Sequence, residues 1–245
     1  MVRKIIGEVL LGVALLKGET LYIGAAGNTA YLLPELIAQF QKEYPNLQIK
    51  PVIASSGKLT LLIEHGAPFQ LFLSANMKYP ETLYRHGFGA EPPKVYAYGL
   101  LALATKDPNF QLKWENLPKA SKIAIANPKV APYGAAAVEA LQKGGLYPAL
   151  KGRVVYSENV TGVIPYLLNG VPVGIVAKSA LYSDQARKLH LRTAPVPREY
   201  YTPIAQGVLL LKRGGEGARV FYKFLFSKKA RAIFRKFGYL PPEER

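Results

Sequence analysis

The chain has 245 residues, of which 49% are hydrophobic and 20% are charged, and its formal net charge is +16. This length and composition suit a folded protein with a full hydrophobic core and exclude a largely disordered chain. The absence of cysteine excludes disulfides, thiolate metal sites and thiol nucleophiles. The positive charge favours anionic partners such as nucleic acid, a lipid surface or a small anion, without choosing among them.

The first 18 residues have the pattern of an export or anchor segment. Arg3 and Lys4 precede a mostly apolar run over residues 5–16, as in a secretory signal. Glu8 interrupts this run, no small-x-small cleavage site follows it, and it is too short to span a bilayer. We therefore expect residues 1–18 to be a signal peptide or an N-terminal anchor, with an amphipathic surface helix as the alternative.

Beyond residue 18, short apolar runs alternate with longer amphipathic ones. The pattern predicts strands at 21–26, 47–54, 69–74, 122–127, 153–156, 173–177 and 205–211, and a new apolar run begins at 96–105. It predicts helices at 32–40, 58–65, 80–86, 135–143, 163–168, 217–226 and 228–237. Such alternation indicates a mostly parallel, doubly wound sheet. The segment 195–203 is polar, rich in tyrosine and without a period.

Three strand-to-helix junctions place small hydrogen-bonding residues where a helix begins, at residues 25–29, 54–57 and 157–161. At a fourth, Tyr133 brings a phenol, and at the first, Asn28 is a good N-cap candidate. Free backbone N–H groups and the positive end of the helix dipole converge at such turns, and a doubly wound sheet gathers them at one edge. Several together would bind a tetrahedral anion without any Lys or Arg. Taken singly, each is more simply an ordinary helix cap.

Taken in order, these motifs resemble those of the periplasmic molybdate-binding proteins. The resemblance rests on Ala-Ala-Gly-Asn at 25–28, Ala-Ser-Ser-Gly at 54–57, Gly-Ala-Pro-Phe at 66–69, Phe-Leu-Ser-Ala at 72–75 and Asn-Pro-Lys-Val-Ala-Pro-Tyr-Gly at 127–134. It continues to Phe-Gly-Tyr at 237–239 and so covers nearly everything after residue 18. It implies the type II periplasmic-binding-protein fold, with two doubly wound α/β lobes joined by two crossover segments. We expect residues 19–96 and 204–245 to form lobe 1, and residues 97–203 to form lobe 2.

The resemblance also implies the ligand positions. In this sequence they are Asn28, Ser56, Tyr133 through its phenol and Val160 through its backbone N–H, with Thr29 and Ser55 as neighbours. The implied ligand is molybdate or tungstate, so the metal is bound as an oxyanion, without direct metal ligands and without a cofactor. A second phenol found in another branch of the family is missing, because Ala177 stands at its position. Gln70 and Asn76 stand where the family often has Asp, which leaves open how hydrogen bonds are made around residues 72–74.

The implied function is that of a monomeric, periplasmic or otherwise extracytoplasmic binding protein that serves the membrane permease of an ABC importer and is not an enzyme. It would meet the membrane only through the transporter or an N-terminal anchor. Binding of sulfate or phosphate is an alternative, as are a transferase on the same fold acting on an acidic substrate and the sensing half of a regulator. The residues themselves contain no nucleotide-binding loop, no serine elbow and no paired carboxylates. His65, His86 and His190 lack metal-ligand spacing.

The end of the chain is strongly basic. Residues 212–245 contain ten Lys and Arg against three Glu. Phe221, Phe224 and Ile233 lie on one face of the predicted helices, so the basic side chains form solvated opposite faces. No recognised nucleic-acid-binding motif accompanies the charge, and we expect no nucleic-acid partner.

Overall fold

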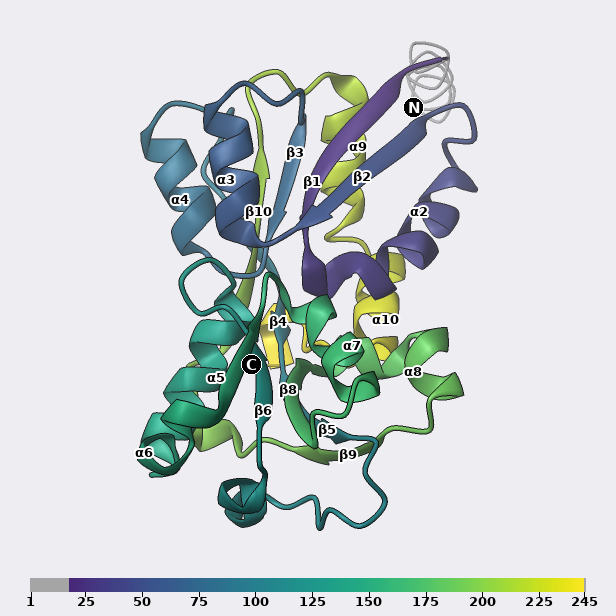
Figure 1. Ribbon diagram of the computed structural model, residues 1–245. Coiled ribbons are helices and arrows are strands. Elements are labelled where there is room, and N and C mark those ends of the chain that lie inside the picture. Colours follow the sequence, from purple (N-terminus) through teal and green to yellow (C-terminus); the bar gives the residue numbers. More distant parts are fainter. Residues whose placement is uncertain (1–17, 245) are drawn as a thin grey trace.

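The structure is a computed structural model that describes residues 18–244, except for the side chains of Gln185 and Glu244. Two lobes are each built on a five-stranded sheet with helices on both faces (Figure 1). The predicted α/β fold with two lobes is therefore confirmed. The signal or anchor predicted for residues 1–18 lies, apart from Gly18, outside the described residues. Within the described range, no helix combines the length and apolar character needed to cross a membrane.

The first lobe, upper in Figure 1, contains a sheet with the strand order β2-β1-β3-β10-β4. Its strands are β1 Thr20–Ala26, β2 Gln48–Ala54, β3 Leu71–Ser74, β4 Lys94–Gly99 and β10 Ile204–Leu210. Helices α2 Leu33–Gln41, α9 Glu216–Phe224 and α10 Lys228–Lys236 share one hydrophobic cluster, which contains Leu36, Phe221 and Phe234. Helices α3 Ser56–Glu64 and α4 Lys78–Arg85 bury Leu59 and Leu83 in another.

The second lobe repeats this plan with the strand order β7-β6-β8-β5-β9. Its strands are β5 Leu101–Thr105, β6 Ile123–Ala126, β7 Val154–Ser157, β8 Val173–Ala177 and β9 Arg192–Pro195. Helix α5 Pro132–Lys143 packs in one cluster around Ile125 and Ala137, and α7 Val163–Leu168 in another around Ala124 and Ile164. Short helices α6 Tyr147–Leu150 and α8 Asp184–Lys188 complete the lobe.

The chain passes between the lobes twice. It leaves the first sheet at Leu100, between β4 and β5, and returns through residues 196–203, between β9 and β10. The boundary between the lobes that was predicted from the sequence, after residue 96, therefore falls inside β4. The two strands that enter a lobe from the other one, β5 and β10, run antiparallel to both of their neighbours. Each sheet is thus half antiparallel rather than mostly parallel.

Two further details differ from the sequence predictions. The apolar run at 96–105 belongs to two strands in different sheets, because burial continues across the crossover and leaves no polar break in the pattern. No strand or helix was predicted from the sequence at strand β9, because its residues are largely exposed and do not alternate between apolar and polar.

Candidate functional site

The predicted junctions meet at a small cavity with a free volume of about 10 Å³, where the two lobes face each other. Its lining residues are Ala26, Gly27, Asn28, Ser55, Ser56, Ala75, Ala131, Pro132, Tyr133, Asn159 and Val160. Five of the six predicted site residues are among them, and the sixth, Thr29, is not. The hydroxyl of Thr29 instead donates to the carbonyl of Ala26 at 2.7 Å. No Lys, Arg, Asp, Glu or His lines this cavity.

Ser55 and Ser56 open helix α3 at the cavity. Ser55 is the N-cap, and its Oγ accepts the backbone N–H of Lys58 at 3.3 Å. Ser56 lies in the first turn, where its Oγ accepts the N–H of Ala75 at 3.0 Å. In these two hydrogen bonds each hydroxyl is the acceptor, and a hydroxyl can also donate. Both serines therefore keep an O–H proton that can be offered to a ligand.

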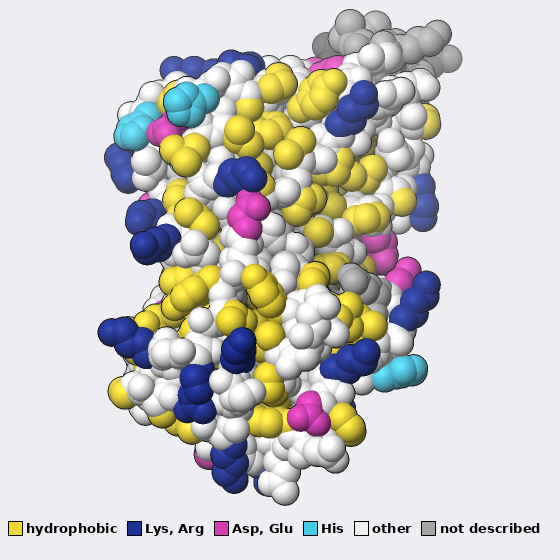
Figure 2. Space-filling view, viewed as in Figure 1, with side chains coloured by type: hydrophobic (Ala, Val, Ile, Leu, Met, Phe, Trp, Pro, Cys, Tyr) yellow, Lys and Arg dark blue, Asp and Glu magenta, His cyan; other side chains and the backbone are white. Residues whose placement is uncertain are grey.

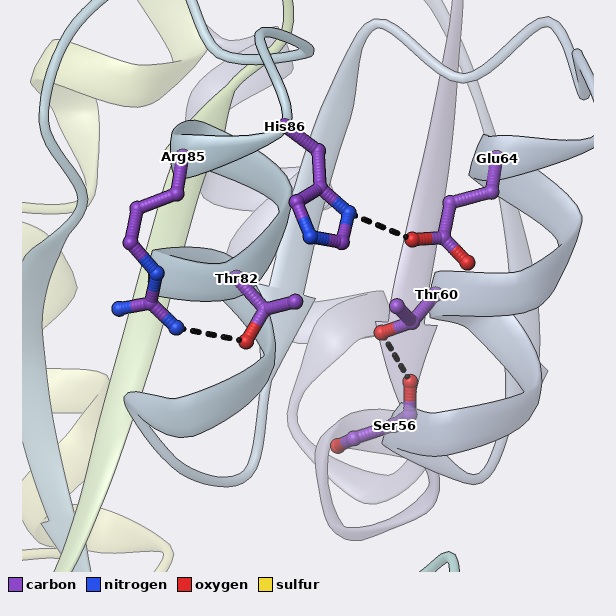
Figure 3. A network of polar contacts seen from close by, with 6 residues as sticks. All are labelled: Ser56, Thr60, Glu64, Thr82, Arg85 and His86. Atoms are coloured by element: carbon purple, nitrogen blue, oxygen red, sulfur yellow. Dashed lines mark hydrogen bonds and ion pairs between the residues drawn. The ribbon is translucent and has the colours of Figure 1, made fainter.

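Contacts along α3 and α4 hold this helix start in place (Figure 3). The carbonyl of Ser56 accepts the hydroxyl of Thr60 at 2.9 Å. At the other end of α3, Glu64 Oε1 lies 3.0 Å from Nδ1 of His86, which caps α4. Asn76, at the start of the segment leading to α4, accepts the N–H of Tyr79 at 3.3 Å through its side chain. Asn76 and Gln70, which stand where the family often has Asp, thus both form hydrogen bonds. The Oε1 of Gln70 accepts the N–H of Tyr22 at 3.0 Å.

Asn28 does not cap a helix, so that prediction is wrong. The N-cap of the 3₁₀ helix η1 Gly27–Tyr31 is Ala26, and Asn28 lies inside the first turn, fully buried. Its Nδ2 donates to Gln206 Oε1 and to the hydroxyl of Tyr239, both at 2.7 Å. The side chain points toward these two partners, which are distant in the sequence, and not toward the start of its own helix. Neither partner was predicted from the sequence; the one signal for Gln206 was a lone amide within an apolar strand.

Tyr133 and Val160 contribute the second lobe's part of the cavity. Tyr133 is in the first turn of α5, and its side chain is buried with the hydroxyl packed against Gly99, at the end of β4. Burial raises the pKa of Tyr133 well above its usual value, so the phenol stays protonated. Val160 begins the 3₁₀ helix η4 Val160–Gly162, capped by Asn159, whose Oδ1 accepts the N–H groups of Thr161 and Gly162. Tyr133 and Val160 both line the cavity at the first turns of their helices, where backbone N–H groups have no partner within the helix.

The lobes are in contact around the cavity. Gly57 at the start of α3 donates its N–H to the carbonyl of Val130 at 3.0 Å. Lys58 forms an exposed ion pair with Glu158 at 3.0 Å, and Ser179 Oγ donates to the carbonyl of Asn28 at 3.0 Å. Each of these bonds joins one lobe to the other, so the structure has a closed cleft.

The positive charge of the chain lies on its surface. On the face seen in Figure 2, Lys and Arg side chains are spread over both lobes, and hydrophobic side chains gather on the upper lobe. Exposed apolar residues there include Val52, Ile53 and Leu61. Within residues 18–244, no three His, Asp or Glu side chains gather as a metal site would require. The chemistry of the cavity is therefore that of neutral hydrogen-bond donors.

The chain matches the family described as "Bacterial extracellular solute-binding protein" over residues 21–240. It belongs to this family. It is 35% identical over 195 residues to the molybdate-binding protein ModA of Rhodobacter capsulatus, which covers 76% of this chain and 74% of the relative. It is 28% identical to the putative ABC transporter substrate-binding lipoprotein YvgL of Bacillus subtilis, over 91% of this chain and 87% of the relative.

A solved structure agrees with this assignment. The periplasmic molybdate-binding protein of Azotobacter vinelandii superposes with a TM-score of 0.81 and 29% identity, over 91% of this chain and 99% of that one. Both the lobes and their connections are therefore shared with a solute-binding protein along almost the entire chain.

Proposed function

We propose that this chain is the extracytoplasmic binding protein of an ABC importer and that it binds molybdate or tungstate in the cavity between its lobes. The observation that carries the proposal is the cavity itself, which is small, lies between the lobes and is lined by helix starts and hydroxyls without a charged side chain. The names of the relatives support the ligand and the transport role. The membrane partner would be the importer's permease.

The cavity suits a small, fully deprotonated oxyanion. Its free volume of about 10 Å³ in this closed arrangement is far below the range of about 300–1,000 Å³ typical of pockets for organic ligands. Helix starts and hydroxyls offer N–H and O–H donors, and helix dipoles add a favourable field of about 0.3–1 kcal/mol each. We assign Asn28, Ser56, Tyr133 and Val160 as the principal ligand residues, with Ser55 beside them. For Asn28, Tyr133 and Val160 we assign the backbone N–H, since both N–H groups of the Asn28 amide are already taken by Gln206 and Tyr239.

Thr29 has a different part in this proposal. Its hydroxyl is bound to Ala26 and it does not line the cavity, so we assign it to holding η1 in place. No cofactor and no direct metal ligand are invoked. The ligand's oxygens meet the protein, and its metal does not.

Sulfate and phosphate are the competing ligands. Both are tetrahedral, but their oxygen atoms lie closer together than those of molybdate. Phosphate also carries a proton near neutral pH, and that proton is a poor fit to a cavity lined by hydrogen-bond donors. A transferase acting on an acidic substrate would need a side chain that takes part in the reaction. Among the described residues that line the cavity, none carries a titratable carboxyl, imidazole or amine. Binding and release are what the lining residues can perform.

A thermal-shift titration tests the proposal. Molybdate or tungstate at 100 times its dissociation constant should stabilise the fold by about 2.7 kcal/mol. Sulfate and phosphate at the same concentration should give a much smaller shift. No shift with either metal oxyanion would contradict the proposal, and turnover of an acidic substrate would favour the transferase.

A further inference from the structure

The hydroxyl of Tyr239 is buried where the two lobes meet. The residue follows α10, and its ring packs in the core of the first lobe against Phe234. The hydroxyl accepts Nδ2 of Asn28 at 2.7 Å and donates to the backbone carbonyl of Asn28 at 2.9 Å. One phenol therefore holds both the side chain and the backbone of a residue that lines the cavity.

The same hydroxyl also reaches the second lobe. It lies 3.2 Å from Oγ of Ser179, in the 3₁₀ helix η5 Lys178–Tyr182. Ser179 in turn donates to the Asn28 carbonyl at 3.0 Å. The helices η1 and η5, which belong to opposite lobes, are thus joined around a single oxygen atom.

Gln206 completes the restraint on Asn28. Its Nε2 donates to the carbonyl of Ile204 at 2.7 Å, so its Oε1 must face the Asn28 amide, whose Nδ2 donates to it at 2.7 Å. The Asn28 Oδ1 is buried and has no hydrogen-bond partner among the described residues. The amide is therefore held only through its two N–H groups, one on Gln206 and one on Tyr239.

We propose that Tyr239 is a positioning residue of the oxyanion site: its hydroxyl fixes Asn28 relative to Ser179 of the second lobe and keeps the lobes closed on the ligand. The inference rests on the proposed function. Without the hydroxyl, one of the two N–H groups of the buried Asn28 amide loses its acceptor, and the contact with Ser179 is lost. A buried donor without a partner is unfavourable, so the closed arrangement becomes less populated.

The variant Tyr239→Phe removes this one oxygen and keeps the ring. Tyr96→Phe is a matched control, since Tyr96 is equally buried in the same core, and its hydroxyl has no hydrogen-bond partner in the part of the chain described. We expect Tyr239→Phe to weaken molybdate binding about tenfold in calorimetry, mainly through faster dissociation in stopped-flow measurements. Tyr96→Phe should change the affinity less than about twofold. Equal affinities of Tyr239→Phe and the unmodified chain would overturn the inference.

A double-mutant cycle separates positioning from a general loss of structure. If Tyr239 acts through Asn28, Tyr239→Phe should cost less than about threefold in an Asn28→Ala background, whereas it should keep its tenfold cost beside Ser56→Ala. A tenfold cost in both backgrounds would assign the hydroxyl to general stability and overturn the inference. The unmodified chain is titrated first. If it binds neither molybdate nor tungstate, the proposed function fails and the inference with it; if it binds, the variants judge the inference alone.

Discussion

Gly57 donates its backbone N–H to the carbonyl of Val130 at 3.0 Å, which joins the first turn of α3 in one lobe directly to the loop before α5 in the other. The approach is close because position 57 has no side chain. A Cβ there would lie 3.2 Å from the Val130 Cα and 3.0 Å from the Tyr79 hydroxyl. Cleft closure and the absence of a side chain at this position are therefore linked.

Gly57→Ala should separate the effects on stability and on binding. Alanine favours a helix over glycine by up to about 1 kcal/mol, so the open form should be no less stable. The added methyl group opposes closure, so the affinity for molybdate should fall by about three- to tenfold. Calorimetry and thermal unfolding measure the two quantities. Gly152→Ala is the control, since a Cβ there meets nothing within 4 Å. An unchanged affinity for Gly57→Ala would show that the closed contact is not needed.

Ser56→Ala should weaken oxyanion binding by about 1–3 kcal/mol, because it removes a donor at the cavity and leaves the Ala75 N–H without its acceptor. Asn28→Ala should have a loss of similar size. Ser227→Ala is a suitable comparison, since Ser227 caps α10 through the N–H of Ala230 and does not line the cavity. It should lower the free energy of unfolding by about 1 kcal/mol and leave the affinity unchanged. If Ser56→Ala and Asn28→Ala both bound the oxyanion with normal affinity, these residues would have only a structural role at their helix starts.

Lys58 and Glu158 form an ion pair between the lobes, but both side chains are more than half exposed. Such pairs contribute about 0–1 kcal/mol and are screened by salt. Glu158→Gln should therefore lower the affinity less than about fivefold at low salt, and the difference from the unmodified chain should vanish near 1 M salt. Glu43→Gln breaks a comparable pair with Lys229 inside the first lobe and should leave the affinity unchanged. A large loss that persists at high salt would give the pair a greater part in closure than its exposure allows.

The buried phenols predict how the protein responds to alkali. Burial raises the pKa of Tyr239 to about 12, and that of Tyr31 likewise to about 12. Since these values lie above the unfolded value of 10.0, the stabilisation is fully present below pH 10 and is lost as the pH rises toward 12. Unfolding free energies measured from pH 7 upward should show no loss from these phenols until about pH 10 and then fall. If Tyr239 ionised near pH 10, the unmodified chain would show more tyrosinate absorbance at that pH than Tyr239→Phe. That result would contradict the burial of Tyr239.

The sequence predicted the local parts of the site better than the distant ones. Ser55 and Ser56 were recognised because a cap and its helix are neighbours in the chain, and the signal is complete within a few residues. Asn28 was misread as a cap because its actual partners, Gln206 and Tyr239, are 178 and 211 residues away.

The fold followed a similar division. Buried strands and amphipathic helices were predicted close to their observed positions, because each has its own periodic pattern. The antiparallel course of β5 and β10 was not, since it depends on the direction from which the chain enters each lobe. The division of residues 96–105 between two sheets was likewise invisible in a continuous apolar run.

Neutral donors in the cavity, and not the surface charge of +16, should hold the ligand. Calorimetry of molybdate binding from about 0.01 M to about 1 M salt tests this, because the Debye length falls from about 30 Å to about 3 Å over that range. We expect the dissociation constant to change less than about threefold, with any salt effect confined to the association rate. A loss of affinity by orders of magnitude would contradict it and place the anion among the surface Lys and Arg side chains.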